Sequence, residues 1–327
     1  MKALWYTRRG ILIPLQQPDK VYMQIGLVGL GKMGSSLARK WCRADTHVVG
    51  FDTDATRMEE LKSEGGFEAA YSLDALLNAV TAPRTIWVML PVGRANHQVL
   101  DELRLKLSPG DTVIDGGNSH YKDTVTRAEQ FRLLGINMID AGVSGGLQGL
   151  ENGFCVMIGG ESSTTASLKR VLEALAPHPN QLLHCGPSGA GHFVKMVHTA
   201  IEYGMMQSIS EGFSLLAAKR EFDFDLSAIA ENWRSSSGVR SFLLDLTANV
   251  LKDNSALDGV APIVGDSGDG RFAAIEAIEQ GIPVPVITQA LLSRFQTQGQ
   301  GDFAAKVNVL LRSGWGGHDV PRKNAND

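Results

Sequence analysis

Gln24-Ile25-Gly26-Leu27-Val28-Gly29-Leu30-Gly31-Lys32-Met33-Gly34 is the stretch that decides the fold of this chain. Its apolar start predicts a buried strand, and three glycines then follow in the spacing G-x-G-x-x-G. In such a turn the first glycine allows a tight bend, the second lets backbone N–H groups approach a pyrophosphate, and the third lets the helix pack closely on the strand. Because glycines also make ordinary turns, the pattern is weak alone. The cofactor contacts that it predicts are Gly29, Leu30, Gly31, Lys32, Met33 and Gly34.

An acidic residue strengthens this interpretation. The next predicted strand, His47–Phe51, ends at Asp52, about 20 residues downstream, where a ribose-binding acid is expected. A carboxylate there accepts a hydrogen bond from the 2′-hydroxyl of NAD and repels the 2′-phosphate of NADP. Arg57 lies one helical turn further on and is either a partner for that phosphate or a solvated helix residue. We therefore predict NAD as the cofactor, with NADP as the less favoured alternative.

Around this motif the chain alternates between short apolar runs and amphipathic segments up to about Gly186. That alternation predicts a parallel sheet with helices on both faces. The strands are predicted at Gln24–Val28, His47–Phe51, Thr85–Met89, Thr112–Asp115 and Asn137–Ala141.

After the glycine-rich junction at 187–191 no strand signal remains, so the rest is predicted to be helical. The expected helices are Ala190–Ala218, Leu226–Trp233, Ser241–Leu251, Arg271–Glu279, Pro283–Gln296 and Phe303–Leu311. We thus expect an α/β protein in which a Rossmann-type doubly wound sheet (residues 23–187) precedes an all-helical substrate and oligomerisation domain (188–327). Residues 1–22 precede Met23 and are interpreted as an extension, either disordered or upstream of the native start.

Composition narrows the classes of protein further. The 327 residues carry 31 Lys and Arg against 35 Asp and Glu, a net charge of −4, so no general field attracts nucleic acid or an anionic membrane. No apolar run approaches the ~18 residues of a membrane span, and Pro14 interrupts the weak export-like pattern near the N-terminus. The three cysteines are widely spaced, which favours neither disulfides nor a metal site and suits a reducing cytoplasm. They are Cys42, Cys155 and Cys185.

Two glycine-rich loops follow predicted strands at the edge where doubly wound sheets bind ligands. The first is Asp115-Gly116-Gly117-Asn118-Ser119 and the second is Gly142-Val143-Ser144-Gly145-Gly146. Paired glycines beside Asn or Ser expose backbone donors to an anion. Ordinary turn chemistry explains either loop alone about as well.

The helix that begins at Ala190 carries a second signal. Helical spacing places Lys195, Thr199, Glu202 and Tyr203 on one face, beside an apolar stripe of Val194, Val197, Ile201 and Met205. Lys195 and Glu202 are two turns apart, ~10 Å along the axis, so they could flank one small substrate as an acid–base pair. From this helix alone, a solvated ion-pair face is an equally good interpretation.

Taken together, these motifs resemble 6-phosphogluconate dehydrogenase, the decarboxylating enzyme, in a short form without the enlarged C-terminal helical region. The resemblance extends from Met23 to Val320. Its specific pieces are the two loops at 115–119 and 142–146, the helix segment 191–204, and Arg312 followed by Gly316-Gly317-His318. It implies oxidative decarboxylation of 6-phosphogluconate to ribulose 5-phosphate and CO2 with reduction of NAD, as in the pentose phosphate pathway, without a metal ion.

The resemblance also implies roles for individual residues. Lys195 is the proton acceptor, Glu202 is the proton donor, and Arg240 binds the substrate phosphate. Arg312 and His318 form a C-terminal pair that reaches the active site of a neighbouring subunit, which implies a homodimer or homotetramer. The other implied substrate contacts are Asn118, Ser144, Gly145, Gly146, His198, Thr199 and Tyr203, and the further cofactor contacts are Leu90, Pro91, Val92 and Asn118.

Two positions depart from the family pattern. Thr199 stands where the family has an asparagine, and Ser267 stands where long forms have a phosphate-binding lysine. Arg271 either compensates for that lysine or simply begins a helix. Two alternatives therefore remain, a related β-hydroxyacid dehydrogenase, for example one acting on 3-hydroxyisobutyrate, and a catalytically silent dinucleotide-binding protein. Glu202 argues against both alternatives. Against the first stand also Arg240, Tyr203 and the tail with Arg312 and His318, and against the second stands Lys195.

Overall fold

The computed structural model describes residues 5–8, 11–14, 23–254, 257–316 and 319–320. The chain divides into two compact units, residues 1–195 and 196–327, and the division falls inside one long helix rather than at 187/188. Within the N-terminal extension, β1 (Trp5–Arg8) and β2 (Ile11–Pro14) pair as an antiparallel hairpin. These two segments are therefore strands, where disorder was one of the two interpretations.

The first unit is built on an eight-stranded sheet in the order β10-β9-β8-β7-β6-β3-β4-β5. All neighbouring strands are parallel except β8 and β9, which are antiparallel. The predicted Rossmann-type sheet is confirmed. The strands are β3 (Met23–Val28), β4 (Thr46–Phe51), β5 (Phe67–Ala69), β6 (Thr85–Val88), β7 (Thr112–Asp115), β8 (Asn137–Ser144), β9 (Cys155–Gly159) and β10 (Leu182–Gly186).

The sequence pattern missed β5, β9 and β10, and the expectation of a purely parallel sheet was wrong for β9. Between β8 and β9 lie only the short turns η1 (Gly146–Gln148) and α6 (Gly149–Asn152). A parallel return needs a crossover of a dozen or more residues. Because this connection is shorter, β9 comes back antiparallel to β8.

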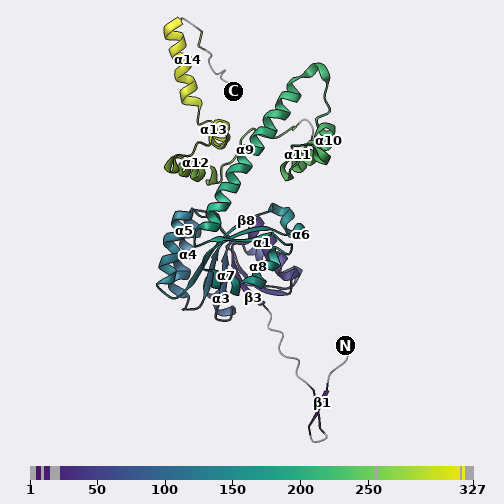
Figure 1. Ribbon diagram of the computed structural model, residues 1–327, viewed down its shortest axis with the longest axis vertical. Helices are drawn as coiled ribbons and strands as arrows, with labels where there is room; N and C mark the ends of the chain where they lie inside the picture. The colour runs from purple at the N-terminus through teal and green to yellow at the C-terminus, as the bar shows by residue number, and fades with distance from the viewer. Residues whose placement is uncertain (1–4, 9–10, 15–22, 255–256, 317–318, 321–327) are drawn as a thin grey trace. The chain divides into compact units, whose positions relative to one another are not determined.

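Helices cover both faces of the sheet (Figure 1). Alternate strand residues enter two separate cores, so that Ile86 and Val88 pack in one while Trp87 packs in the other. The Trp87 side has α1 (Lys32–Arg43), α2 (Ala55–Glu64) and α8 (Lys169–Leu175), and the opposite side has α3 (Leu73–Ala79), α4 (Arg94–Lys106) and α5 (Tyr121–Arg132). A short helix, α7 (Ser162–Ser167), precedes α8.

The second unit is helical in all of its described residues apart from loops, as predicted. Helix starts follow local signals: the side chains of Asp225 and Ser241 cap two helices by accepting from the N–H groups of Ala228 and Leu244. The elements are α9 (Ala190–Ala218, shared with the first unit), η2 (Arg220–Phe222), α10 (Leu226–Ser236), α11 (Phe242–Asp253), α12 (Asp269–Gln280), α13 (Pro285–Thr297) and α14 (Asp302–Gly316).

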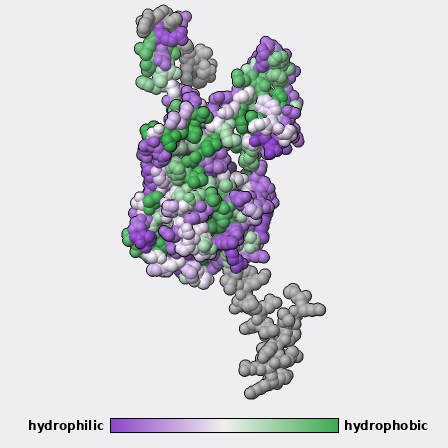
Figure 2. All heavy atoms as spheres, in the orientation of Figure 1, coloured by the Kyte–Doolittle hydropathy of each residue, from purple (hydrophilic) through white to green (hydrophobic). Residues whose placement is uncertain are grey.

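Helix α9 buries some polar side chains and exposes some apolar ones, the reverse of the usual pattern. Lys195 and Thr199 are buried, whereas Val197 and Ile201 of the apolar stripe are 36% and 49% exposed. Apolar side chains are also exposed on α14, and Figure 2 shows hydrophobic residues at the surface of this part of the chain. No helix among the described residues has the length and apolarity to cross a bilayer.

Candidate active site

The glycine-rich turn between β3 and α1 has the geometry that its sequence predicts. Gly29 has φ +94°, and a Cβ there would meet the Met89 carbonyl oxygen at 2.5 Å. A Cβ at Gly34 would lie 1.9 Å from the Gly29 carbonyl oxygen, so only glycine allows the helix this close to the turn. At Gly31 a Cβ would meet no described atom within 4 Å. The first and third glycines are required by the fold, and the second leaves open space beside the N-terminus of α1.

Asp52, at the end of β4, lies against the same turn. Its Oδ2 accepts a hydrogen bond from the Leu30 N–H at 2.6 Å, and its Oδ1 accepts one from the Asp54 N–H at 2.8 Å. Arg57 contacts Asp54 at 3.2 Å and lies 3.8 Å from Asp52. The cation is therefore held beside two carboxylates, with its side chain half exposed.

Three loops meet at the carboxyl edge of neighbouring strands. The strand order reverses between β3 and β6, which is the switch point where doubly wound sheets bind dinucleotides. The turn after β6 holds Leu90, Pro91 and Val92, and a Cβ at Gly117, after β7, would lie 2.3 Å from the Leu90 carbonyl oxygen. Hence the structure brings the predicted 90–92 segment beside the 115–119 loop.

The 115–119 loop is organised by a buried carboxylate. Asp115 accepts hydrogen bonds from the Gly117 N–H (3.0 Å), the Asn96 amide (3.1 Å) and the Ser119 hydroxyl (2.7 Å). Asn118 adopts the left-handed region, at φ +57°, and its Oδ1 is buried with no hydrogen-bond partner among the described residues. Buried polar atoms are normally satisfied, so this amide is a candidate ligand contact.

Lys195 is 6% exposed and lies against β8 in the first unit. A Cβ at Gly142 would lie 2.4 Å from the Lys195 Cβ, so the lysine stem occupies the space that a larger residue would fill. Two residues further along β8, Ser144 ends the strand. Gly145 and Gly146 follow it with φ of +132° and +53°. A Cβ at Gly146 would meet no described atom within 4 Å, which leaves its backbone accessible.

Further along α9, His198 and Glu202 form an i,i+4 pair, with Nδ1 3.4 Å from Oε2. Both side chains are about one-third exposed. Glu202 therefore lies on the same helix as Lys195, two turns away, and retains access to solvent. Thr199, at the departure from the family pattern, is buried.

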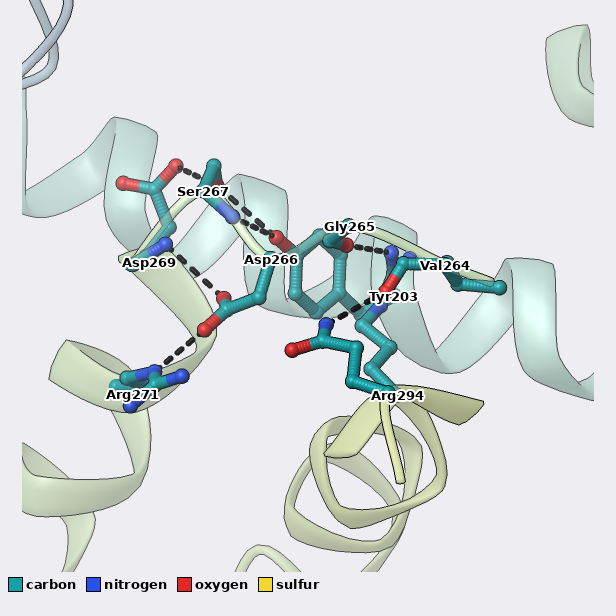
Figure 3. A network of polar contacts seen from close by, with 10 residues as sticks. Tyr203, Val264, Gly265, Asp266, Ser267, Asp269, Arg271 and Arg294 are labelled. Atoms are coloured by element: carbon teal, nitrogen blue, oxygen red, sulfur yellow. Dashed lines mark hydrogen bonds and ion pairs between the residues drawn. The ribbon is translucent and has the colours of Figure 1, made fainter. Parts of the chain in front are cut away.

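Tyr203 is fixed to the loop before α12 (Figure 3). Its phenol oxygen accepts a hydrogen bond from the Ser267 N–H at 2.9 Å and lies 3.0 Å from the Ser267 hydroxyl. That hydroxyl donates to Asp269 at 2.9 Å, so the phenol proton is the one that joins the two oxygens. A Cβ at Gly270 would meet the Tyr203 ring at 2.9 Å. Ser267 thus holds Tyr203 in place.

The sequence analysis missed Arg294. Its guanidinium lies 3.6 Å from the centre of the Tyr203 ring and donates to the Gly265 carbonyl at 2.7 Å, and the residue is buried. A cation stacked on an aromatic ring is a recognised interaction, but its partner stands far away in sequence. The available signal was an arginine in the last turn of an otherwise uncharged helix, α13.

Arg271 belongs to the same loop. Its Nε donates to Asp266 at 2.5 Å, and its guanidinium lies 4.5 Å from the centre of the Phe295 ring. Burial raises the pKa of Asp266, but hydrogen bonds from Arg271 and the Gly268 N–H, with the charge of Arg271, outweigh it and hold the pKa below its usual value. The Arg271 charge is therefore engaged by the loop itself.

The predicted substrate residues Arg240, Arg312 and His318 lie outside the loop that holds Tyr203 or outside the described residues. Arg240 lines a hollow of about 460 Å³ together with Ile201, Met205, Ser241 and Val286. Arg312 lies exposed on α14, and His318 lies outside the described residues. Within the second unit, the ring of Tyr203 contacts Arg294, whereas Arg240 faces the hollow beside the exposed stripe of α9.

The cofactor turn at the switch point and the buried lysine at the same edge define a dehydrogenase that uses a nicotinamide dinucleotide. Comparison with known proteins narrows this class. Residues 24–186 match the NAD binding domain of 6-phosphogluconate dehydrogenase, and residues 191–314 match the C-terminal domain of the same enzyme. The chain belongs to the 6-phosphogluconate dehydrogenase family and is a decarboxylating oxidoreductase of that kind.

Individual relatives are similar in sequence to this protein over nearly the whole chain. A putative 6-phosphogluconate dehydrogenase of Bacillus subtilis is 37% identical and covers 92% of this chain and 100% of its own length. An NAD(+)-dependent, decarboxylating 6-phosphogluconate dehydrogenase of Haloferax volcanii is 38% identical with the same coverage. The solved Plasmodium falciparum enzyme has a TM-score of 0.76 and 28% identity, covering 93% of this chain and 67% of its own. Other relatives are named as NAD(+)- or as NADP(+)-dependent.

Proposed function

We propose that this protein converts 6-phosphogluconate into ribulose 5-phosphate and CO2 with reduction of NAD. The observation that carries the proposal is the burial of Lys195 against Gly142 at the carboxyl edge of the sheet, on the same helix as Glu202. A buried amine and a carboxylate two turns apart can exchange protons with different atoms of one small substrate, the amine with a hydroxyl oxygen and the carboxyl group with a carbon.

The residues at the switch point fit a dinucleotide. The open space at Gly31 beside the N-terminus of α1 suits a pyrophosphate, and the Asp52 carboxylate at the end of β4 suits a ribose with two free hydroxyls. The bound dinucleotide supplies hydride acceptance. Arg57 is held beside Asp52 and Asp54. These carboxylates partly neutralise its charge and so weaken its attraction for a 2′-phosphate. This arrangement supports NAD over NADP.

In this proposal Lys195, as the neutral amine, accepts the proton of the C3 hydroxyl as the hydride leaves C3. The resulting ammonium then donates a hydrogen bond to the C3 carbonyl. That bond stabilises the negative charge that develops there while the C1 carboxylate leaves as CO2. Glu202 finally protonates the carbon that lost the carboxylate, which becomes C1 of ribulose 5-phosphate. Asn118, with its unsatisfied Oδ1, and the 144–146 backbone position the sugar acid.

Binding the phosphate group of the substrate requires cationic side chains. Arg240 and the tail residues Arg312 and His318 are proposed for it, with the tail supplied by a neighbouring subunit of a cytoplasmic homodimer or homotetramer. Arg294 is a further candidate, because it is a buried cation in contact with Tyr203. Planar guanidinium groups suit phosphate through paired hydrogen bonds.

The decisive experiment is steady-state formation of NADH from 6-phosphogluconate, with gluconate and 3-hydroxyisobutyrate as alternative substrates. We expect turnover with 6-phosphogluconate and release of CO2 in equal amount. Preference for 3-hydroxyisobutyrate would favour the related β-hydroxyacid dehydrogenase. A protein that binds NAD without turning over any of the three would be a silent dinucleotide-binding protein.

A further inference from the structure

A buried carboxylate anchors the start of α9. Asp140 is fully buried in the middle of β8. Its Oδ1 accepts from the Gly189 N–H at 2.7 Å and its Oδ2 from the His192 N–H at 2.8 Å. These are N–H groups at the beginning of a helix, which have no partner within the helix and are normally capped by a nearby side chain. Because Gly189 has no side chain, the cap comes from the sheet.

The first turn of α9 is consequently pressed onto β8 and β9. A Cβ at Gly191 would lie 2.5 Å from the Met157 carbonyl oxygen and 2.7 Å from the Gly159 nitrogen. One turn further on, the stem of Lys195 occupies the space over Gly142. The height and rotation of Lys195 over the sheet are therefore set by contacts that lie in the turn before it.

His192 connects this turn to the other loop of the site. Its Nε2 lies 3.0 Å from the backbone carbonyl oxygen of Asp115, and its Nδ1 lies 2.8 Å from the Thr124 hydroxyl of α5. Since a carbonyl oxygen can only accept, Nε2 carries a proton, and in the neutral ring Nδ1 accepts from Thr124. The imidazole is 2% exposed. The His192 ring thus links α9, which carries Lys195, to Asp115, the first residue of the loop that carries Asn118.

We propose that His192 is a positioning residue for the reaction: the hydrogen bond from its Nε2 to Asp115 sets Lys195 relative to the loop that carries Asn118. The role of Lys195 in this statement rests on the proposed function. The contacts themselves belong entirely to the first unit. A proton-accepting amine displaced by about 1 Å from its substrate can cost up to ~10²-fold in rate, so the effect of losing this bond falls on kcat.

The test compares two amides at one position. In His192→Gln the amide nitrogen reaches the position of Nε2 and can still donate to the Asp115 carbonyl, whereas in His192→Asn it reaches only the position of Nδ1. We expect His192→Asn to lower kcat by about 10- to 100-fold and to leave the KM for NAD within roughly twofold. His192→Gln should restore most of kcat.

A matched control is available in the same sheet. His184 also has its Nε2 near a backbone carbonyl, that of Gly160 at 2.8 Å, but it lies on the edge strand β10. His184→Asn should leave kcat unchanged. Thr124→Val, which removes the second partner of the His192 ring, should give a smaller loss and serves in place of His192→Asn if that variant does not fold.

Amide hydrogen exchange of the full-length protein without substrate separates the two proposals. We expect His192→Asn, but not His192→Gln, to increase exchange in residues 116–119 and 189–195. If this exchange pattern is found in a protein that does not oxidise 6-phosphogluconate, the proposed function is wrong, but His192 still sets Lys195 relative to the 115–119 loop. Normal kcat in His192→Asn and Thr124→Val, or equal losses in both amides at position 192, would overturn the positioning role.

Discussion

The Asp52 carboxylate accepts a hydrogen bond from the backbone N–H of Leu30 at 2.6 Å, so the acid at the end of β4 and the middle of the glycine-rich turn are directly joined. This contact places a negative charge beside the N-terminus of α1, where the cofactor phosphates are expected. It also shows that Asp52 serves the shape of the turn as well as the choice of cofactor.

The first prediction concerns that choice. The kcat/KM with NAD should exceed that with NADP. Asp52→Asn should narrow the difference, because the amide oxygen can still accept from the Leu30 N–H without repelling a 2′-phosphate, while the amide nitrogen gives up the bond from the Asp54 N–H. Both values are measured at saturating sugar acid. Asp54→Asn is the comparison variant: it removes a charge that pairs with Arg57 but leaves the Asp52 carboxylate in place, so it should narrow the difference less than Asp52→Asn does. If the ratio of kcat/KM with NAD to that with NADP is unchanged in Asp52→Asn, Asp52 does not select the cofactor.

The second prediction concerns Lys195. Lys195→Met should reduce NADH formation by ~10²-fold or more, the usual loss for a missing acid–base group. The exposed Lys169, which forms an i,i+4 pair with Glu173, provides a control, and Lys169→Met should be near normal. Near-normal turnover in Lys195→Met would show that another group accepts the proton.

Glu202→Gln should affect a later step. If Glu202 only protonates the enediol, the variant should still form NADH in the first turnover and then slow in the release of ribulose 5-phosphate. Rapid-mixing measurement of NADH together with a product assay distinguishes the two steps. A missing first burst of NADH, where the wild type shows one, would place Glu202 in the oxidation step instead.

The third prediction concerns the loop that holds Tyr203. Tyr203→Phe removes the acceptor of the N–H of Ser267, an exposed residue, which costs about 1 kcal/mol, whereas Ser267→Ala removes the hydroxyl that donates to the buried Asp269 carboxylate, which costs about 1–3 kcal/mol. Urea unfolding should therefore find Ser267→Ala the less stable of the two variants. The reverse order would mean that the Tyr203 phenol, rather than the Ser267–Asp269 hydrogen bond, holds the loop.

The fourth prediction is that the active site is shared between subunits. Arg312 lies on α14, near the end of the chain, and is proposed to serve a neighbouring site. Inactive Lys195→Met subunits mixed with inactive Arg312→Ala subunits should regain activity, because some mixed sites contain both intact groups. Absence of complementation, when tagged subunits are shown to exchange, would indicate a self-contained site.

Local sequence was sufficient for the parts of this fold that depend on neighbours in the chain. The turn at Gly29, Gly31 and Gly34 follows from backbone sterics within a few residues. The bounds of α9 were predicted without error, and α10 and α11 begin after side chains that cap their first N–H groups. Strand β5 was missed because it has only three residues, and β10 because it lies at the sheet edge with a partly exposed apolar pattern. Strand β9 has a buried apolar run, Val156 to Ile158, that the sequence did offer.

What only the tertiary structure decided are the contacts between residues far apart in sequence. Periodicity put Lys195 and an apolar stripe on two faces of α9, yet it could not show that the lysine is buried while Val197 and Ile201 are exposed. The bond between His192 and Asp115 spans 77 residues, and the stacking of Arg294 on Tyr203 also joins distant segments. The sequence by itself determined the cofactor turn, the helices and the acid–base candidates, because helical period and backbone sterics act locally. Burial and partnership depend on which surfaces pack together, so they were decided only when the sheet and helices assembled.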